Sequence, residues 1–286
     1  MKLLRNMLIH EVIFGGYILF TLLRLLYTVG LASEHTAIYA LSLLVVAVGP
    51  LITKQSDSAW AWRLRLLIYP VLMNVLFVNM RWVSPLINEG KRDAVLWELD
   101  KIIAGGSLSV RMQGIVSPPL TELMSLFYIF FMPYLFLSML AYLFSKPAQA
   151  RVFYSGLFSL YGIGYMGYTL VPAIGPYIIY ATEFSVPLTG YLMTETLKDW
   201  YPSGTNYTDI FPSLHCAVSA YILFSDAMWH RKRFYLFLIP CIGIWISTLY
   251  LRYHYFVDII AGAIVAAIAL YIERLEYRRE LRAADR

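Results

Sequence analysis

Charged residues are scarce in this sequence of 286 residues, since only 14% are Asp, Glu, Lys or Arg. Soluble domains contain about 25% charged and about 45–50% apolar residues. This chain is 59% hydrophobic and has a mean hydropathy of +0.62. This composition excludes soluble, disordered and fibrous proteins, and we expect no nucleic-acid partner despite the net charge of +5. The chain is therefore predicted to be an integral membrane protein.

Cysteine is nearly absent as well, since the chain has only Cys216 and Cys241, both in apolar surroundings. Such a pair predicts no disulfide framework. Aromatic residues, in contrast, make up 16% of the chain and include 23 Tyr and 7 Trp. Tyr and Trp collect at membrane–water interfaces, so their abundance agrees with repeated crossing of a bilayer.

The sequence contains several long apolar segments. A bilayer core about 30 Å thick needs about 20 apolar residues of helix, and eight segments meet this need. We therefore predict an all-α, polytopic membrane bundle that forms one membrane domain over residues 1–286. The predicted spans are 10–31, 37–53, 66–82, 122–145, 152–172, 212–230, 234–251 and 256–273.

The basic residues predict how these spans are oriented, because Lys and Arg are retained on the cytoplasmic side. If the N-terminus is cytoplasmic, 15 of the 23 Lys and Arg residues lie in cytoplasmic segments, and one, Arg24, lies within the first span. Both termini are then cytoplasmic, and we expect a bacterial inner membrane with the functional face toward the periplasm. The seven outside cations are Arg81, Lys91, Arg92, Lys101, Arg111, Lys198 and Arg252.

Two long segments lie outside in this topology. Residues 83–121 contain an apolar-periodic stretch, Ala94–Ile103, which predicts a helix lying in the membrane interface. Residues 173–211 are rich in Pro, Gly, Tyr and Thr and are interpreted as an ordered lid. Long loops of this kind are often functional.

One histidine lies at the outer start of the span 212–230, in the sequence Phe-Pro-Ser-Leu-His over 211–215. We place Pro212 in the first helical turn, where its missing N–H costs nothing. The unpaired N–H groups of a first turn favour an anion. His215 is therefore a candidate for contact with a negatively charged substrate.

A second histidine, His254, lies in the turn before the last span and precedes Asp258 by four residues. If the helix begins near Tyr253, both side chains share one face. A carboxylate there accepts from one imidazole nitrogen and leaves the other facing a substrate. The topology places His215, His254, Asp258 and Arg252 at one membrane depth, on the outer side.

This set of residues suits phosphoryl transfer, because it offers a nucleophile, a general acid and positive groups for the phosphate oxygens. A structural alternative stays open: His254 and Asp258 lock two helices together, and His215 caps a helix. The remaining histidines flank spans and are interpreted as structural: His10, His35 and His230.

The segment Pro212-Ser213-Leu214-His215, followed by His254-x-x-x-Asp258, resembles the second and third motifs of the type 2 phosphatidate phosphatase superfamily. The Phe-Pro-Ser-Leu-His form is similar to the branch of fungal inositol phosphorylceramide synthases and their bacterial relatives. Gly262 follows Asp258, as the third motif of that branch requires. The resemblance covers about residues 120–275 and implies a six-helix phosphatase-like core, to which residues 1–83 add further helices.

The resemblance also implies a role for each matching residue. His254 would attack phosphorus and become a phosphohistidine, and Asp258 would orient and charge-stabilise it. His215 would protonate the leaving alkoxide and then act as a base toward the acceptor. No metal or other cofactor is implied. The phosphate would be held by Ser213, Arg252, Pro212 and Leu214.

The chain departs from the family pattern in its cations. The family's first motif supplies a Lys and an Arg, and its third motif supplies an Arg six residues before the His. Here that position is Thr248, and Arg252 lies only two residues before His254. We therefore expect at least one outside cation to approach the phosphate, the alternatives being Arg81, Lys91, Arg92 and Lys198. The cation-free region that corresponds to the first motif contains Tyr165, Tyr168, Gly175 and Pro176.

Arg24 is a costly charge within the first span. It could bind a lipid phosphate, pair with Glu122 or Asp226, or extend toward the interface. The Tyr and Gly residues over 161–168 could line a lipid groove, although small residues at such spacing more often indicate close helix packing.

We therefore expect a phosphatase or phosphotransferase that acts on a phospholipid or polyprenyl phosphate among the membrane lipids. Water would complete the reaction in the first case and an alcohol in the second. A non-catalytic transporter, flippase or channel that binds its cargo with the same residues is the alternative. A scaffolding protein is a third possibility, and it predicts that His215 and His254 lie far apart.

Overall fold

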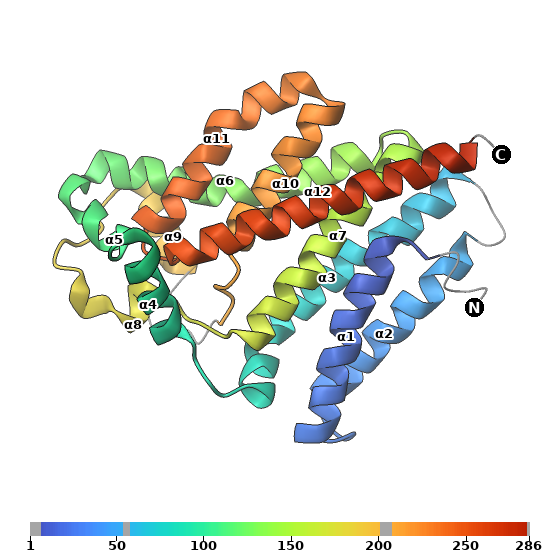
Figure 1. Cartoon of the computed structure of the whole chain (residues 1–286), viewed down its shortest axis with the longest axis horizontal. Coiled ribbons are helices and arrows are strands. Elements are labelled where there is room, and N and C mark those ends of the chain that lie inside the picture. Colours follow the sequence, from blue (N-terminus) through green and yellow to red (C-terminus); the bar gives the residue numbers. More distant parts are fainter. Residues whose placement is uncertain (1–6, 54–57, 201–207, 285–286) are drawn as a thin grey trace. The chain divides into compact units, whose positions relative to one another are not determined.

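The structure is a computed structural model, and it describes residues 7–53, 58–200 and 208–284 (Figure 1). The described residues form helices and contain no strand, apart from an isolated bridge between Ala173 and Asp209. The eight long helices are α1 (Ile9–Thr28), α2 (Glu34–Ile52), α3 (Ala59–Ile87), α6 (Pro118–Leu143), α7 (Pro147–Leu170), α10 (Leu214–Trp229), α11 (Arg231–Tyr250) and α12 (Phe256–Ala284).

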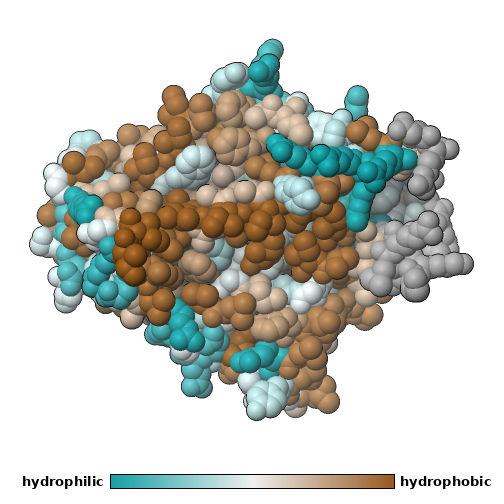
Figure 2. Space-filling view, viewed as in Figure 1, coloured by the Kyte–Doolittle hydropathy of each residue, from teal (hydrophilic) through white to brown (hydrophobic). Residues whose placement is uncertain are grey.

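The long helices coincide with the eight predicted spans. Six of them, α1, α2, α3, α6, α11 and α12, are long and apolar enough to cross a membrane. Figure 2 shows broad hydrophobic areas on the surface, as expected for helices that face lipid. The prediction of an all-α polytopic membrane bundle is confirmed, while the number of spans stays a prediction.

Short helices occupy the two long segments that we expect outside the membrane. The helix predicted over Ala94–Ile103 is present as α4 (Asp93–Ala104), which is longer by one residue at each end, while its place in the membrane interface stays a prediction. The other short elements are α5 (Leu108–Arg111), η2 (Met112–Ile115), α8 (Pro176–Ile179), η3 (Ala181–Glu183) and α9 (Leu192–Trp200).

The chain divides into two compact units. Unit 1 contains Met1–Glu89, Leu137–Leu170 and Ala267–Arg286, and unit 2 contains Gly90–Phe136 and Val171–Ala266. Helices α6 and α12 contribute to both units, because the division falls within each of them. All of the second- and third-motif residues lie in unit 2.

Unit 1 contains a buried ion pair. The Arg65 guanidinium donates to the Glu11 carboxylate over 2.7 and 2.5 Å and to the Thr53 hydroxyl over 2.7 Å. Both charged side chains are at most 1% exposed. A buried pair of this kind needs good geometry and further hydrogen bonds to offset its desolvation, and the bidentate contact together with Thr53 provides both.

Three other polar or small residues of unit 1, Arg24, Gly162 and Tyr165, contact neighbouring helices. Arg24 donates to the carbonyl of Ile87 at the end of α3 over 2.5 Å, and a cation is favourable at a helix C-terminus. A Cβ added to Gly162 of α7 would lie 3.0 Å from the Phe14 Cα, so this glycine permits close packing with α1. The Tyr165 hydroxyl donates to the carbonyl of Met73.

Candidate active site

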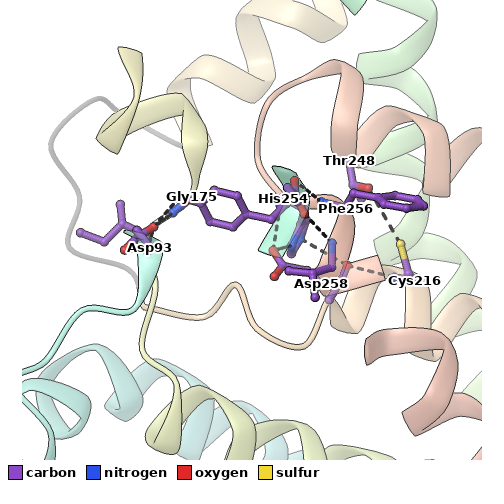
Figure 3. Close-up of polar contacts among 12 residues, drawn as sticks. Asp93, Gly175, Cys216, Thr248, His254, Phe256 and Asp258 are labelled. Atoms are coloured by element: carbon purple, nitrogen blue, oxygen red, sulfur yellow. Dashed lines mark hydrogen bonds and ion pairs between the residues drawn. The ribbon is translucent and has the colours of Figure 1, made fainter. Parts of the chain in front are cut away.

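His254 lies in the turn between α11 and α12 and is 1% exposed. Its Nδ1 is 3.3 Å from Asp258 Oδ2, and its Nε2 is 3.4 Å from the Ser213 hydroxyl (Figure 3). Because a carboxylate only accepts, Nδ1 carries the proton and Nε2 presents its lone pair. The helix begins at Phe256 rather than near Tyr253, yet the spacing of four residues still brings His254 and Asp258 together.

Burial lowers the pKa of His254 well below its usual value, and the neighbouring His215 lowers it further. The imidazole is therefore neutral at physiological pH. Only the neutral ring offers a lone pair at Nε2, so this environment keeps His254 in the form that a nucleophile requires.

His215 lies in the first turn of α10 and approaches His254 from a separate helix. The two ring centroids are 5.8 Å apart and the ring planes are inclined at 65°. The rings of Tyr128 and Phe131 on α6 hold His215, with centroids 4.4 and 4.5 Å from its own. This separation leaves both imidazoles within contact distance of one phosphate group, which the scaffolding alternative does not predict.

Ser213 is the N-cap of α10, and its hydroxyl accepts from the Cys216 amide over 3.4 Å. Pro212 therefore precedes the cap and does not occupy the first helical turn, which corrects our placement. The helix starts later because the Ser213 side chain, rather than a preceding carbonyl, satisfies an amide of the first turn. Within the described residues, nothing accepts from the amides of Leu214 and His215.

The start of α10 rests directly on α12. The Ser213 amide donates to the Asp258 carbonyl over 3.1 Å. A Cβ added to Gly262 would lie only 2.6 Å from the Ser213 carbonyl oxygen, so this position accepts no larger residue without movement. The absence of a side chain one turn after Asp258 thus allows the start of α10 to lie directly against α12.

Arg252 precedes His254 by two residues and is 5% exposed. It adopts a left-handed backbone conformation with φ of 67°. Its Nη2 donates to the Val186 carbonyl over 2.5 Å, and its guanidinium carbon lies 4.4 Å from the centroid of the Phe184 ring. Nε has no hydrogen-bond partner among the described residues. A buried guanidinium without a carboxylate partner favours an anionic ligand.

The region assigned to the first motif is divided between the two units. Gly175, with φ of 103°, precedes α8 in unit 2, and a Cβ on it would lie 2.6 Å from the Tyr253 carbonyl oxygen. Pro176 is buried as the first residue of α8. Tyr165 and Tyr168 belong to α7 in unit 1, where their rings stack on each other. Gly175 thus packs against the turn that carries His254, whereas the two tyrosines pack within the other unit.

The outside cations have other surroundings. Lys91 and Arg92 are exposed, and Lys198 pairs with Glu195 over 2.7 Å. Arg81 belongs to unit 1, where its guanidinium lies over Trp82. The described contacts of unit 2 do not join Lys91, Arg92 or Lys198 to His215, His254 or Ser213, and the expectation that an outside cation approaches the phosphate stays a prediction.

Two carboxylates next to the site were missed in the sequence. Asp93 and Asp100 of α4 are 3% and 2% exposed and hydrogen-bond to residues just after His254. Their spacing of seven residues, on the same face as Leu96 and Trp97, was the available signal. No group of three or more His, Cys, Asp or Glu within the described ranges is arranged to hold a metal ion.

Searches of curated proteins and of solved structures found no match to this chain. The sequence matches the family model described as the PAP2 superfamily over residues 110–272. The matched segment contains both histidines, Ser213, Arg252 and Asp258, and it comprises more than half of the 286 residues. The chain therefore belongs to the PAP2 superfamily.

Proposed function

We propose that this protein transfers the phosphoryl or phospho-head group of a membrane lipid through a phosphohistidine at His254, with water or an alcohol as the final acceptor. Membership of the PAP2 superfamily supports a lipid phosphatase or phosphotransferase in general. The observation that carries the finer proposal is the His254 ring, whose Nδ1 faces Asp258 while Nε2 faces Ser213, with His215 opposite.

In the first step, Nε2 of His254 attacks phosphorus and the bond between phosphorus and the leaving oxygen breaks. His215, protonated in the presence of the phosphate charge, donates its proton to the leaving oxygen. The His254 ring becomes positively charged as the N–P bond forms. The Asp258 carboxylate, 3.3 Å from Nδ1, stabilises that charge.

In the second step, water or an alcohol attacks the phosphohistidine. His215, now neutral, accepts the proton of the attacking hydroxyl, and the N–P bond breaks. The pair returns to its starting protonation state, so each turnover consumes one acceptor molecule and leaves no net proton on the protein.

The phosphate oxygens would meet three kinds of donor. Arg252 provides a guanidinium with an unpartnered Nε, and Ser213 provides its hydroxyl. The amides of Leu214 and His215 lie at the N-terminus of α10, where anions are favoured. Pro212 has no N–H to donate to phosphate, so its role would be to restrict the backbone just before Ser213. Together these donors would hydrogen-bond the oxygens of a bound phosphate and offset part of its negative charge.

The substrate class follows from the membrane helices that surround the site. Acyl or prenyl chains can enter from the bilayer while the phosphate reaches the polar residues, so a phospholipid or polyprenyl phosphate fits. Transfer to an alcohol rather than to water would agree with the similarity of the Phe-Pro-Ser-Leu-His sequence to the inositol phosphorylceramide synthases.

Purified full-length protein should act on at least one member of a panel of phosphatidate, a prenyl pyrophosphate and a phosphoinositide. We expect phosphate release without added alcohol if the protein is a phosphatase, and head-group transfer to an added alcohol if it is a transferase. Product analysis by mass spectrometry separates the two outcomes. Lipid movement across vesicles without any new product, in protein that converts none of these lipids, would favour the transporter alternative and contradict the proposal.

We also propose that the site faces the extracytoplasmic side, because 15 of the 23 Lys and Arg lie in segments assigned to the cytoplasm. A Lys91→Cys variant should react with a membrane-impermeant maleimide in intact cells, whereas Lys232→Cys should react only after lysis. Cys216 and Cys241 are buried, so the background should be low. The reverse labelling pattern would overturn this orientation.

A further inference from the structure

Helix α4 carries two buried carboxylates on one face. Asp93 and Asp100 are separated by seven residues, or two helical turns, and both are at most 3% exposed. Between them, the Trp97 ring stacks on Tyr180 with a centroid separation of 4.1 Å and packs edge-on against Tyr255. The buried face of α4 therefore contacts the segment that follows His254.

Asp100 binds the start of α12. Its two carboxylate oxygens accept from the Phe256 and Val257 amides, each over 2.9 Å. These are the first two residues of the helix, whose amides have no partner within the helix itself. Since Asp258 lies in the same turn, Asp100 fixes the backbone that carries the carboxylate partner of His254.

Asp93 binds the residue that directly follows His254. Its Oδ1 accepts from the Tyr255 hydroxyl over 2.8 Å and from the Gly175 amide over 2.9 Å (Figure 3). The Ile174 amide donates to the same carboxylate over 3.1 Å. Gly175 in turn lies against the Tyr253 carbonyl, so Asp93 holds both neighbours of His254 in the sequence, one directly and one through Gly175.

These hydrogen bonds offset the free-energy cost of burying two carboxylates. Neither carboxylate forms an ion pair among the described residues, and a buried charge is unfavourable unless hydrogen bonds replace its water. Burial raises the pKa of Asp100, and the hydrogen bonds from Phe256 and Val257 act in the opposite direction. Two buried acids on one helix face, each with donors around the same short segment, indicate a specific role in holding that segment.

We propose that Asp93 and Asp100 are positioning residues that hold residues 253–258 so that His254 meets both Asp258 and the phosphate. The inference rests on the proposed function, and it extends the site to a helix that precedes the matched family segment, residues 110–272. A misplacement of about 1 Å in a reacting group can lower the rate about 100-fold. The two acids therefore act on the chemical step rather than on lipid affinity.

The test compares alanine and amide variants in the full-length protein. Asp100→Ala removes both acceptors and should lower kcat between about 10- and 100-fold with little change in KM. Asp93→Ala should act in the same direction. Asp93→Asn should recover most of the activity, because one amide oxygen can replace Oδ1 and keep the Tyr255 and Gly175 contacts. Asp100→Asn should recover less, since its NH₂ group would face an amide N–H.

Glu98→Ala is the matched control on the same helix, because Glu98 is exposed and pairs with the exposed Lys101. It should leave kcat and KM unchanged. A change in KM with kcat unaltered would overturn the positioning role. Equal losses of kcat in Asp93→Ala and Glu98→Ala would do so as well. A loss of kcat that Asp93→Asn does not recover would do the same for Asp93.

A second measurement does not depend on turnover. Diethyl pyrocarbonate should modify His254 slowly in the native protein, where the ring is 1% exposed. Peptide mass spectrometry should show faster modification of His254 in Asp100→Ala and Asp93→Ala but not in Glu98→Ala. Unchanged modification rates would overturn the inference even in an inactive preparation. If the native protein converts no lipid but the substitutions still speed the modification of His254, the proposed function alone is contradicted and the positioning contacts are not.

Discussion

Replacement of His254 by alanine should abolish turnover, with a loss of at least about 10³-fold in kcat/KM. The substitution removes the atom that would bond to phosphorus, and Ser213 and Arg252 cannot replace it as a nucleophile. The native protein, quenched during turnover of a ³²P-labelled substrate, should carry label that is lost in acid and retained in base, as expected for a phosphohistidine. His254→Ala should carry no label.

The matched control for this substitution is His35→Ala. His35 is partly buried and hydrogen-bonds to Asn79 in unit 1, outside the proposed machinery. It should retain both activity and the acid-labile label. Label on native protein that is stable in acid, or turnover that survives in His254→Ala, would exclude the histidine intermediate.

Replacement of His215 by alanine should produce a loss that depends on the leaving group. An alkoxide is a poor leaving group without a proton, so turnover of phosphatidate should fall between about 10²- and 10⁴-fold. A nitrophenolate leaves without protonation, so the first step with p-nitrophenyl phosphate should be almost unaffected. Because the second step then lacks its base, phosphorylated His254 should accumulate with this substrate, and rapid-quench labelling measures that accumulation.

A second variant separates the acid–base role of His215 from its packing against Tyr128 and Phe131. His215→Gln keeps a planar polar side chain but cannot transfer a proton at neutral pH, so it should behave like His215→Ala. Turnover of both substrates falls in either case, so the rate of the first step is the measurement that decides. A first step slowed equally with the lipid and with p-nitrophenyl phosphate would indicate a purely structural role for His215.

Much of the fold was predictable because it depends on local composition. Segments of about 20 apolar residues can satisfy their backbone groups within lipid only as helices. The eight expected spans therefore coincide with the eight long helices, and the short apolar stretch Ala94–Ile103 coincides with α4. The contact between His254 and Asp258 was predictable for the same reason, since a spacing of four residues is a local relation.

The remaining features depend on how distant segments pack, which hydropathy does not encode. Tertiary structure brings His215 to 5.8 Å from His254, directs Arg252 toward Val186 and Phe184, and places Tyr165 within unit 1. It also brings Asp93 and Asp100, which lie about 160 residues before Tyr255 and Phe256, to the start of α12. The helices and the local motif could thus be found in the sequence, because apolar length and helical spacing act over a few turns. The polar groups that surround His254 could not, because their contacts arise from packing between helices far apart in the chain.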